Sequence, residues 1–174
     1  MQRARRDPKP WSIGPRRLAA GLAALALVLD AGGALAFECR SAQDAEAAHL
    51  RWLQTQMMVA ALSCQGSVAY NEFVRKNQTT LDWSVARVNQ MFARDHGAGA
   101  AALYNSFNTK LANEAAVERT RLDRNYCRVF ELVYGEALQR SSTELVLYST
   151  EPQRGAASVL PATCSYEASL VQKR

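Results

Sequence analysis

Four cysteines are the side chains of this 174-residue sequence best suited to covalent chemistry. They are Cys39, Cys64, Cys127 and Cys164. No two of them form a CxxC pair, which argues against a zinc ribbon and against a thioredoxin-type redox site. No CxxCH sequence is present for covalent attachment of haem. An even number of cysteines in an exported chain predicts two structural disulfides instead.

Histidine and methionine side chains could together bind copper or haem, as they do in some helical bundles. The candidates are His49, His96, Met57, Met58 and Met91. The two histidines could approach each other if the helix that contains His49 starts at the same end of the bundle at which the helix before His96 ends. We favour structural roles, because a histidine near a helix C-terminus interacts well with the helix dipole and methionine often fills a core. We therefore predict no cofactor and keep a metal- or haem-handling bundle as an alternative.

Acid–base catalysis would need paired carboxylates, or a carboxylate beside a histidine. The acidic side chains with a suitable neighbour within two helical turns are Asp44, Glu46, Glu114 and Glu118. Arg119 and Arg121 follow the second pair, which is typical of a solvated helix surface. The ExxH pattern of di-iron bundles and the GxSxG pattern of hydrolases are both missing. We predict no catalytic residues, and an enzyme with an unrecognised site is a further alternative.

Two tyrosine–asparagine pairs each stand three residues before a phenylalanine, and a further asparagine follows the second pair. These polar candidates are Tyr70, Asn71, Tyr104, Asn105 and Asn113. A buried asparagine is costly unless it is hydrogen-bonded. We predict that the five side chains form an internal network that fixes the register of the helices, as polar residues do in bundles. A binding cleft between helices is the functional alternative.

The first 36 residues have the three parts of a secretory signal. The basic part contains Arg3, Arg5, Arg6, Lys9, Arg16 and Arg17. An apolar run of 12 residues follows at 18–29, and Ala34 and Ala36 supply the small residues of a cleavage site. Twelve residues are too few to cross a bilayer, which takes about 20. We predict a signal peptide over 1–36, cleavage after Ala36 and no membrane span in the mature chain, which begins with Phe37.

The basic character of the chain resides in this leader. The whole sequence has 21 basic and 16 acidic residues and a formal charge of +5. Residues 1–36 hold six and two of these, so that residues 37–174 are close to neutral with 15 and 14. A near-neutral mature chain gives no reason to expect a nucleic acid partner. The apolar fraction of the whole sequence, 48%, is enough to build a core.

Apolar residues recur at helical spacing through most of the mature chain. The pattern predicts helices over residues 42–63, 68–94 and 98–122, with a kink at 77–80 in the second. We expect Gly66 to end the first helix and Ser67 to cap the second. Asp123 is a candidate cap for a fourth helix, although no Gly or Pro prevents the third and fourth from being continuous. Residues 143–148 alternate loosely and are expected to be extended.

These helices predict an all-α fold, an antiparallel four-helix bundle. The bundle domain would span residues 37–140. Residues 141–174 contain several helix breakers and are expected to form an irregular C-terminal tail that is pinned at Cys164.

Two stretches of the chain carry a resemblance to a known family. They are residues 53–64 (LQTQMMVAALSC) with 70–74 (YNEFV), and residues 104–107 (YNSF) with 111–115 (LANEA), ending at Cys127. Together they resemble a family of small exported helical proteins of alphaproteobacteria without an established function. Some members carry a label related to S-adenosylhomocysteine hydrolase, but no GxGxxG sequence for a dinucleotide is present here. The resemblance implies an export signal, a helical domain and a Cys64–Cys127 pair.

The geometry of the predicted bundle also constrains the disulfides. Cys39 and Cys64 flank the first helix, which would hold them about 30 Å apart, whereas bridged Cα atoms lie within about 7 Å. Tracing the antiparallel helices places Cys127 beside Cys64 and returns the tail to Cys39. We therefore predict Cys64–Cys127 and Cys39–Cys164. We expect loss of the first to loosen the core and loss of the second mainly to free the termini.

These features predict the type of protein, but they do not identify a biochemical activity. We predict a periplasmic or secreted, disulfide-stabilised helical protein that binds a protein or a small molecule, and we favour this over an enzyme. The sequence does not name the partner.

Overall fold

The computed structural model describes residues 37–151 and 159–165, and every regular element in them is helical. The α-helices are α1 (Ala42–Ser63), α2 (Ser67–His96), α3 (Ala100–Leu122), α4 (Tyr126–Gln139) and α5 (Ser142–Ser149). Three short 3₁₀ helices are η1 (Gly97–Gly99), η2 (Asp123–Asn125) and η5 (Ala162–Cys164). The all-α prediction is thus confirmed. The predicted signal peptide and parts of the predicted tail lie outside the described residues.

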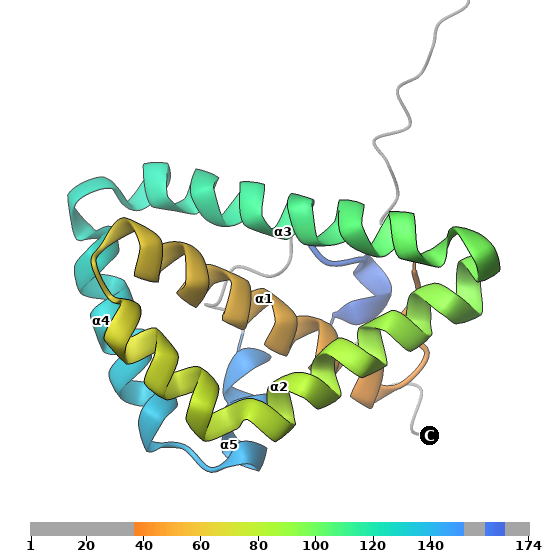
Figure 1. Ribbon diagram of the computed structural model, residues 1–174, viewed down its shortest axis with the longest axis horizontal. Helices are drawn as coiled ribbons and strands as arrows, with labels where there is room; N and C mark the ends of the chain where they lie inside the picture. Colours follow the sequence, from red (N-terminus) through yellow and green to blue (C-terminus); the bar gives the residue numbers. More distant parts are fainter. Residues whose placement is uncertain (1–36, 152–158, 166–174) are drawn as a thin grey trace, which may run out of the picture. The chain divides into compact units, whose positions relative to one another are not determined.

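Helix α1 is the centre of the fold. Figure 1 shows it between α2 and α3, and it also contacts α4, α5 and η5. Thirteen of its 22 residues are buried, among them small alanines such as Ala47, Ala48 and Ala60 that let neighbouring helices approach closely. The structure therefore does not confirm four equivalent antiparallel helices. The periodicity of α1 indicated one apolar face, whereas its alanines allow burial on several sides.

Helix α2 bends where the sequence predicted a kink. Asn77 has non-helical backbone angles (φ −108°, ψ 15°) and its side chain is buried. Its Nδ2 donates a hydrogen bond of 3.0 Å to the Phe73 carbonyl, the group that the Asn77 amide would bind in a regular helix. The bend lets α2 follow α1 in two segments.

The turns that follow α1 and α3 differ in detail from the prediction. Gln65, and not Gly66, has the left-handed conformation after α1, with φ of 56°. Ser67 is the first residue of α2 and does not cap it, because Gly66 holds the N-cap position. Asp123 has φ of 46° and begins η2, so α3 and α4 are separate helices.

The expected extended segment at 143–148 is wrong, because it belongs to helix α5. Ser141 and Glu144 form a capping box: the Ser141 amide donates to Glu144 Oε2 at 2.8 Å, and the Glu144 amide to Ser141 Oγ at 3.4 Å. Leu145 and Tyr148 then bury against the rest of the core. Within the described part of the tail, η5 is also helical, and Cys164 in it is buried. The boundary at residue 140 is therefore not an edge of the packed domain.

Both predicted disulfides are present. Cys39–Cys164 has a Cα–Cα distance of 5.0 Å, and Cys64–Cys127 one of 5.5 Å. The two bonds belong to different apolar clusters of the core. The first cluster contains Cys39, Cys164 and the aromatic side chains Phe37, Phe92 and Phe107. The second is built around α4, and Cys64 packs at its edge.

None of the helices in the described ranges is both long and apolar enough to span a membrane.

Candidate functional site

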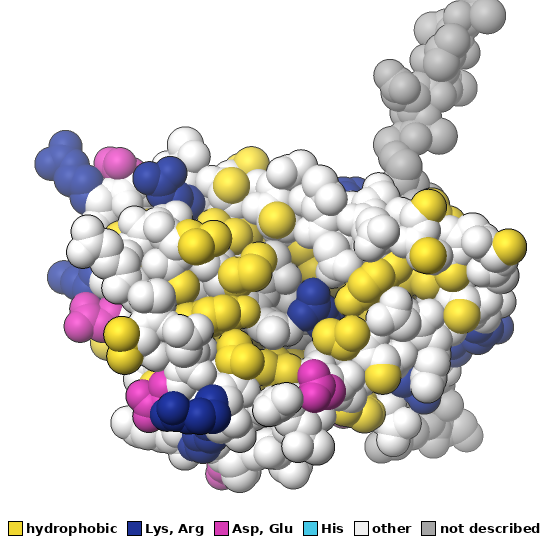
Figure 2. Space-filling model, viewed as in Figure 1, with side chains coloured by type: hydrophobic (Ala, Val, Ile, Leu, Met, Phe, Trp, Pro, Cys, Tyr) yellow, Lys and Arg dark blue, Asp and Glu magenta, His cyan; other side chains and the backbone are white. Residues whose placement is uncertain are grey.

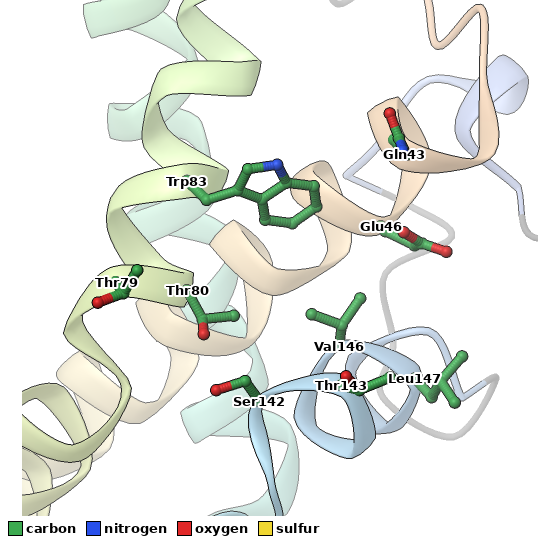
Figure 3. A pocket seen from close by; sticks show the side chains of 9 residues that line it. All are labelled: Gln43, Glu46, Thr79, Thr80, Trp83, Ser142, Thr143, Val146 and Leu147. Atoms are coloured by element: carbon green, nitrogen blue, oxygen red, sulfur yellow. The ribbon is translucent and has the colours of Figure 1, made fainter.

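An open groove lies between α1, the second half of α2 and α5 (Figure 3), with a volume of about 510 Å³. It is lined by Gln43, Glu46, Thr79, Thr80, Trp83, Ser142, Thr143, Val146 and Leu147. A volume of this size is within the usual range for ligand sites. Because α5 forms one wall, the groove exists only through the helix that the sequence pattern did not reveal.

The apolar part of the groove comes from three side chains. Trp83 projects from α2 and is 36% exposed, although it is one of the largest apolar side chains of the chain. Leu147 of α5 is 49% exposed, and Val146 points into the space below the indole (Figure 3). Trp83 faces outward because its neighbours Leu81 and Ser84 are buried on the opposite side of α2. An exposed indole beside an exposed leucine is typical of a binding surface.

Polar side chains complete the rim. Gln43 and Glu46 project from the first two turns of α1, and Ser142 and Thr143 from the first turn of α5. Glu46 is the one charged residue in the lining. Among the residues that the structure describes, no basic side chain pairs with its carboxylate. The groove therefore combines an apolar floor with a single free negative charge.

An ion-pair network centred on a buried aspartate joins α1 to α2 beside the groove. Asp44 is 1% exposed and lies next to Gln43 in the sequence. Its Oδ1 accepts from Arg87 Nε at 2.5 Å, and its Oδ2 from Arg94 Nη1 at 3.2 Å and from the Arg40 amide at 2.9 Å. Arg94 Nε also donates to Asp95 Oδ1 at 2.8 Å. The network thereby fixes the first turn of α1 against the second half of α2.

Both carboxylates of the network remain ionised. Burial alone would raise the pKa of Asp44, but hydrogen bonds from the Arg40 amide, Arg87 and Arg94 together outweigh it and lower that pKa. The Arg94 guanidinium is the main reason that the pKa of Asp95 falls to about 2. Three arginines, Arg40, Arg87 and Arg94, face the two carboxylates and leave neither of them as a free acid or base, so the network is structural.

The predicted metal ligands do not form a site. Met57 is buried in the second apolar cluster and Met91 in the first, while Met58 is 37% exposed. His96 is exposed and packs near Phe92, at 6.4 Å between ring centroids. In the described parts of the chain, no three His, Cys, Asp or Glu side chains are grouped to hold a metal. The start of α1 and the end of α2 do share one pole, as expected, but His49 is buried against the Cys164 carbonyl whereas His96 is exposed.

His49 has a structural role that the sequence did not indicate. Its ring is buried, and Nε2 lies 3.0 Å from the Cys164 carbonyl oxygen. Burial lowers the pKa of His49, and its hydrogen bonds to the carbonyls of Cys164 and Ser149 only partly oppose this. A neutral imidazole that donates to the Cys164 carbonyl ties η5 to α1.

The predicted polar network is also wrong. Asn71, Asn105 and Asn113 are all exposed. Tyr70 and Tyr104 are half-buried and pack against aromatic rings, Tyr104 with Phe92 at 5.9 Å. Each asparagine lies two residues from a buried apolar side chain (Phe73, Phe107 and Leu111), a shift of about 200° around a helix, which turns it toward solvent.

The buried polar side chains lie elsewhere. They are Asp44, His49, Thr55, Gln56, Asn77, Ser84, Ser149 and Thr150. Two signals could have located the groove: the SxxE capping box at residues 141–144, and the position of Trp83 off the apolar stripe of its own helix.

Comparison of the chain with protein-family models, with curated proteins and with solved structures found no match.

Proposed function

We propose that this is an exported binding protein, and that the groove between α1, α2 and α5 takes a ligand with an apolar group next to a positive charge. The observation that carries the proposal is the exposed indole of Trp83 in the same groove as the unpaired Glu46 carboxylate. An indole face attracts cations through its quadrupole, and the carboxylate supplies a complementary charge. Val146 and Leu147 favour the apolar part of the same ligand.

A basic amphipathic peptide segment has the required chemistry. Its leucine-type side chains would pack on Leu147 and Val146, and a lysine or arginine would lie between Trp83 and Glu46. The hydroxyls of Ser142 and Thr143 could bind the peptide backbone of the ligand. The groove is open, so a segment longer than the groove can pass through it.

The binding test compares Trp83→Ala with Leu62→Ala, which removes an apolar side chain that is 82% exposed and outside the groove. The probe is a synthetic peptide of alternating leucine and lysine. We expect Trp83→Ala to weaken peptide binding about tenfold or more, since a central tryptophan is a common hot spot. Isothermal titration calorimetry measures the affinities. Equal affinities of the two variants would refute the groove as the site.

A second comparison tests the charge. Glu46→Gln should weaken binding of the lysine peptide several-fold at low salt, whereas Glu72→Gln on the exposed side of α2 should not. A peptide with serine in place of lysine should bind equally to the wild-type protein and to Glu46→Gln. If Glu46→Gln leaves the affinity for the lysine peptide unchanged, the ligand is apolar only.

Export to the periplasm or to the medium is the second part of the proposal. The three-part leader supports it, and so do two disulfides, which form in oxidising compartments. The family resemblance also agrees with an exported chain. Phe37, the proposed mature N-terminus, packs between Phe92 and Phe107 at 4.9 and 5.2 Å.

We expect the exported protein to begin with Phe37. Intact mass spectrometry of the periplasmic fraction checks this directly, because cleavage after Ala36 removes 36 residues. Substituting Ala36→Arg should block processing, since the cleavage site requires a small residue. A mature protein that still contains Trp11 would contradict the proposed signal peptide.

A further inference from the structure

A second hollow lies where the end of α1 meets the turn between α3 and α4. Its volume is about 310 Å³. It is lined by Ser63, Arg119, Thr120, Asp123, Tyr126 and Cys127. Neither the groove nor the ion-pair network includes any of these residues. Three hydroxyl side chains, one guanidinium and one carboxylate therefore line a small polar space.

Tyr126 has an unsatisfied hydroxyl at this site. The residue is 2% exposed, and its Oη has no hydrogen-bond partner. Burial raises the pKa of this phenol, and the positive charge of Arg119 only partly opposes the rise. Tyr126 is therefore a protonated donor at neutral pH. A buried hydroxyl without a partner costs free energy, which a bound acceptor would recover.

Arg119 is the second donor. The neighbouring arginines are already engaged: Arg121 Nη2 lies 2.5 Å from Glu118 Oε1, and Arg124 Nε lies 3.8 Å from Asp123 Oδ2. In the described ranges no carboxylate forms a salt bridge with Arg119. The one carboxylate in the lining, that of Asp123, is exposed and has Arg124 as its solvent-exposed partner. Figure 2 shows Lys and Arg side chains gathered where α3 passes into α4.

The start of α4 adds a favourable potential. Tyr126 and Cys127 are its first two residues and both line the hollow. No side chain hydrogen-bonds to the N-terminus of this 14-residue helix. Anions bind readily at such helix termini.

We propose that this hollow binds a phosphate-type oxyanion. Arg119 supplies the charge, the Tyr126 hydroxyl supplies a buried donor, and Ser63 supplies a second hydroxyl, whereas the Thr120 hydroxyl donates to the Ala116 carbonyl. Several donors around one small volume match the multiple acceptor oxygens of phosphate better than a single carboxylate. The group could arrive as free phosphate or as the phosphate of a lipid headgroup, and the two sources share this chemistry. The site is independent of the groove and of its cationic ligand.

The test uses inorganic phosphate with the full chain at constant ionic strength, followed by amide chemical shifts of Thr120 and Cys127. We expect saturable binding. Arg119→Gln should weaken it about tenfold, as expected for loss of a charge-assisted hydrogen bond. Arg121→Gln, which removes an equal charge two residues away, should change the affinity less than twofold. Tyr126→Phe should weaken binding several-fold. If Tyr126→Phe alters the fold, Arg119→Gln still tests the site.

Equal weakening by Arg119→Gln and Arg121→Gln would overturn the site and leave only a diffuse basic surface. Absence of saturable shifts at millimolar phosphate would overturn it too. Vesicles of phosphatidic acid, compared with vesicles of phosphatidylcholine, distinguish the sources. If the protein cosediments with phosphatidic acid vesicles and Arg119→Gln abolishes this cosedimentation, the site is supported with a lipid ligand. Phosphate binding without cosedimentation supports it with a free anion.

Discussion

Replacing Asp44 by asparagine is expected to lower the free energy of unfolding by about 3 kcal/mol. The substitution keeps the shape of the side chain and removes the charge that Arg87 and Arg94 share. Arg87 would be left with an uncompensated charge next to a neutral amide, while Arg94 would keep its ion pair with Asp95. Their side chains are 32% and 31% exposed, so they can regain some water, which limits the loss to the lower part of the range for a broken buried ion pair.

Chemical denaturation at neutral pH measures this loss. Asp82→Asn is the matched control, because Asp82 is exposed on α2 and lies outside the network. We expect the control to change the free energy of unfolding by less than about 0.5 kcal/mol. A loss of similar size in both variants would show that the network does not stabilise the junction of α1 and α2.

The same network makes stability sensitive to acid. The pKa of Asp44 is lowered in the folded state, and that of Asp95 falls from its ordinary 3.8 to about 2. The unfolded state therefore binds these protons first as the pH falls. The stabilisation is complete well above pH 4 and is lost as the pH drops through the lowered folded pKa values, of which that of Asp95 is about 2. Asp44→Asn should show a smaller decrease in stability between neutral pH and pH 3 than the wild type.

The parts of the fold that local sequence determines could be predicted. The bounds of α1, the kink near Asn77 and both disulfides follow from apolar spacing, from a polar break and from helix length. Each depends on residues close in sequence or on simple geometry.

The site could not be predicted in this way. The groove joins Trp83 to Glu46 and Val146, which are far apart in the chain. Asp44 and its partner Arg87 are separated by 43 positions, and a pattern does not show which of several acidic residues becomes buried. The asparagine prediction failed for the same reason, since the sequence pattern does not show which polar residues of a helix face the core.

The tail shows a different kind of failure. Residues 143–148 alternate weakly, and the alternation was taken as strand although SxxE at 141–144 is a helix N-terminal signal. Eight residues are too few for a stable isolated helix. Helix α5 forms because Leu145 and Tyr148 bury in the second apolar cluster, so tertiary contact decides its conformation.

The structure also reverses the expected order of importance of the two disulfides. Cys39 and Cys164 are 2% and 1% exposed and belong to the first apolar cluster. Cys127 is exposed, and Cys64 is half-buried at the edge of the second. The chain-entropy model gives the two bonds similar values, about 5 and 4 kcal/mol for loops of these lengths. Any difference in the free energy of unfolding that the two bonds contribute must therefore come from the core side chains that each bond keeps packed.

Cys39–Cys164 fixes both ends of the described domain to α1. The Cys39 amide donates to Thr163 Oγ1 at 3.2 Å, and the Cys164 carbonyl accepts from His49. Val159 and Leu160 are buried in the same cluster as Phe37. Without the bond these apolar side chains are held only by packing, and the cluster can open to water.

We therefore expect the double substitution of Cys39 and Cys164 by alanine to lower the free energy of unfolding by about 3–5 kcal/mol. The matched control is the alanine pair at positions 64 and 127, whose loss should be smaller because Cys127 already faces solvent. Denaturant unfolding without reductant gives both values, and hydrogen exchange of α1 amides shows whether the first cluster opens. The opposite order, with the larger loss at positions 64 and 127, would mean that the termini of the domain contribute little to its stability and that the second cluster is the part that depends on a covalent link.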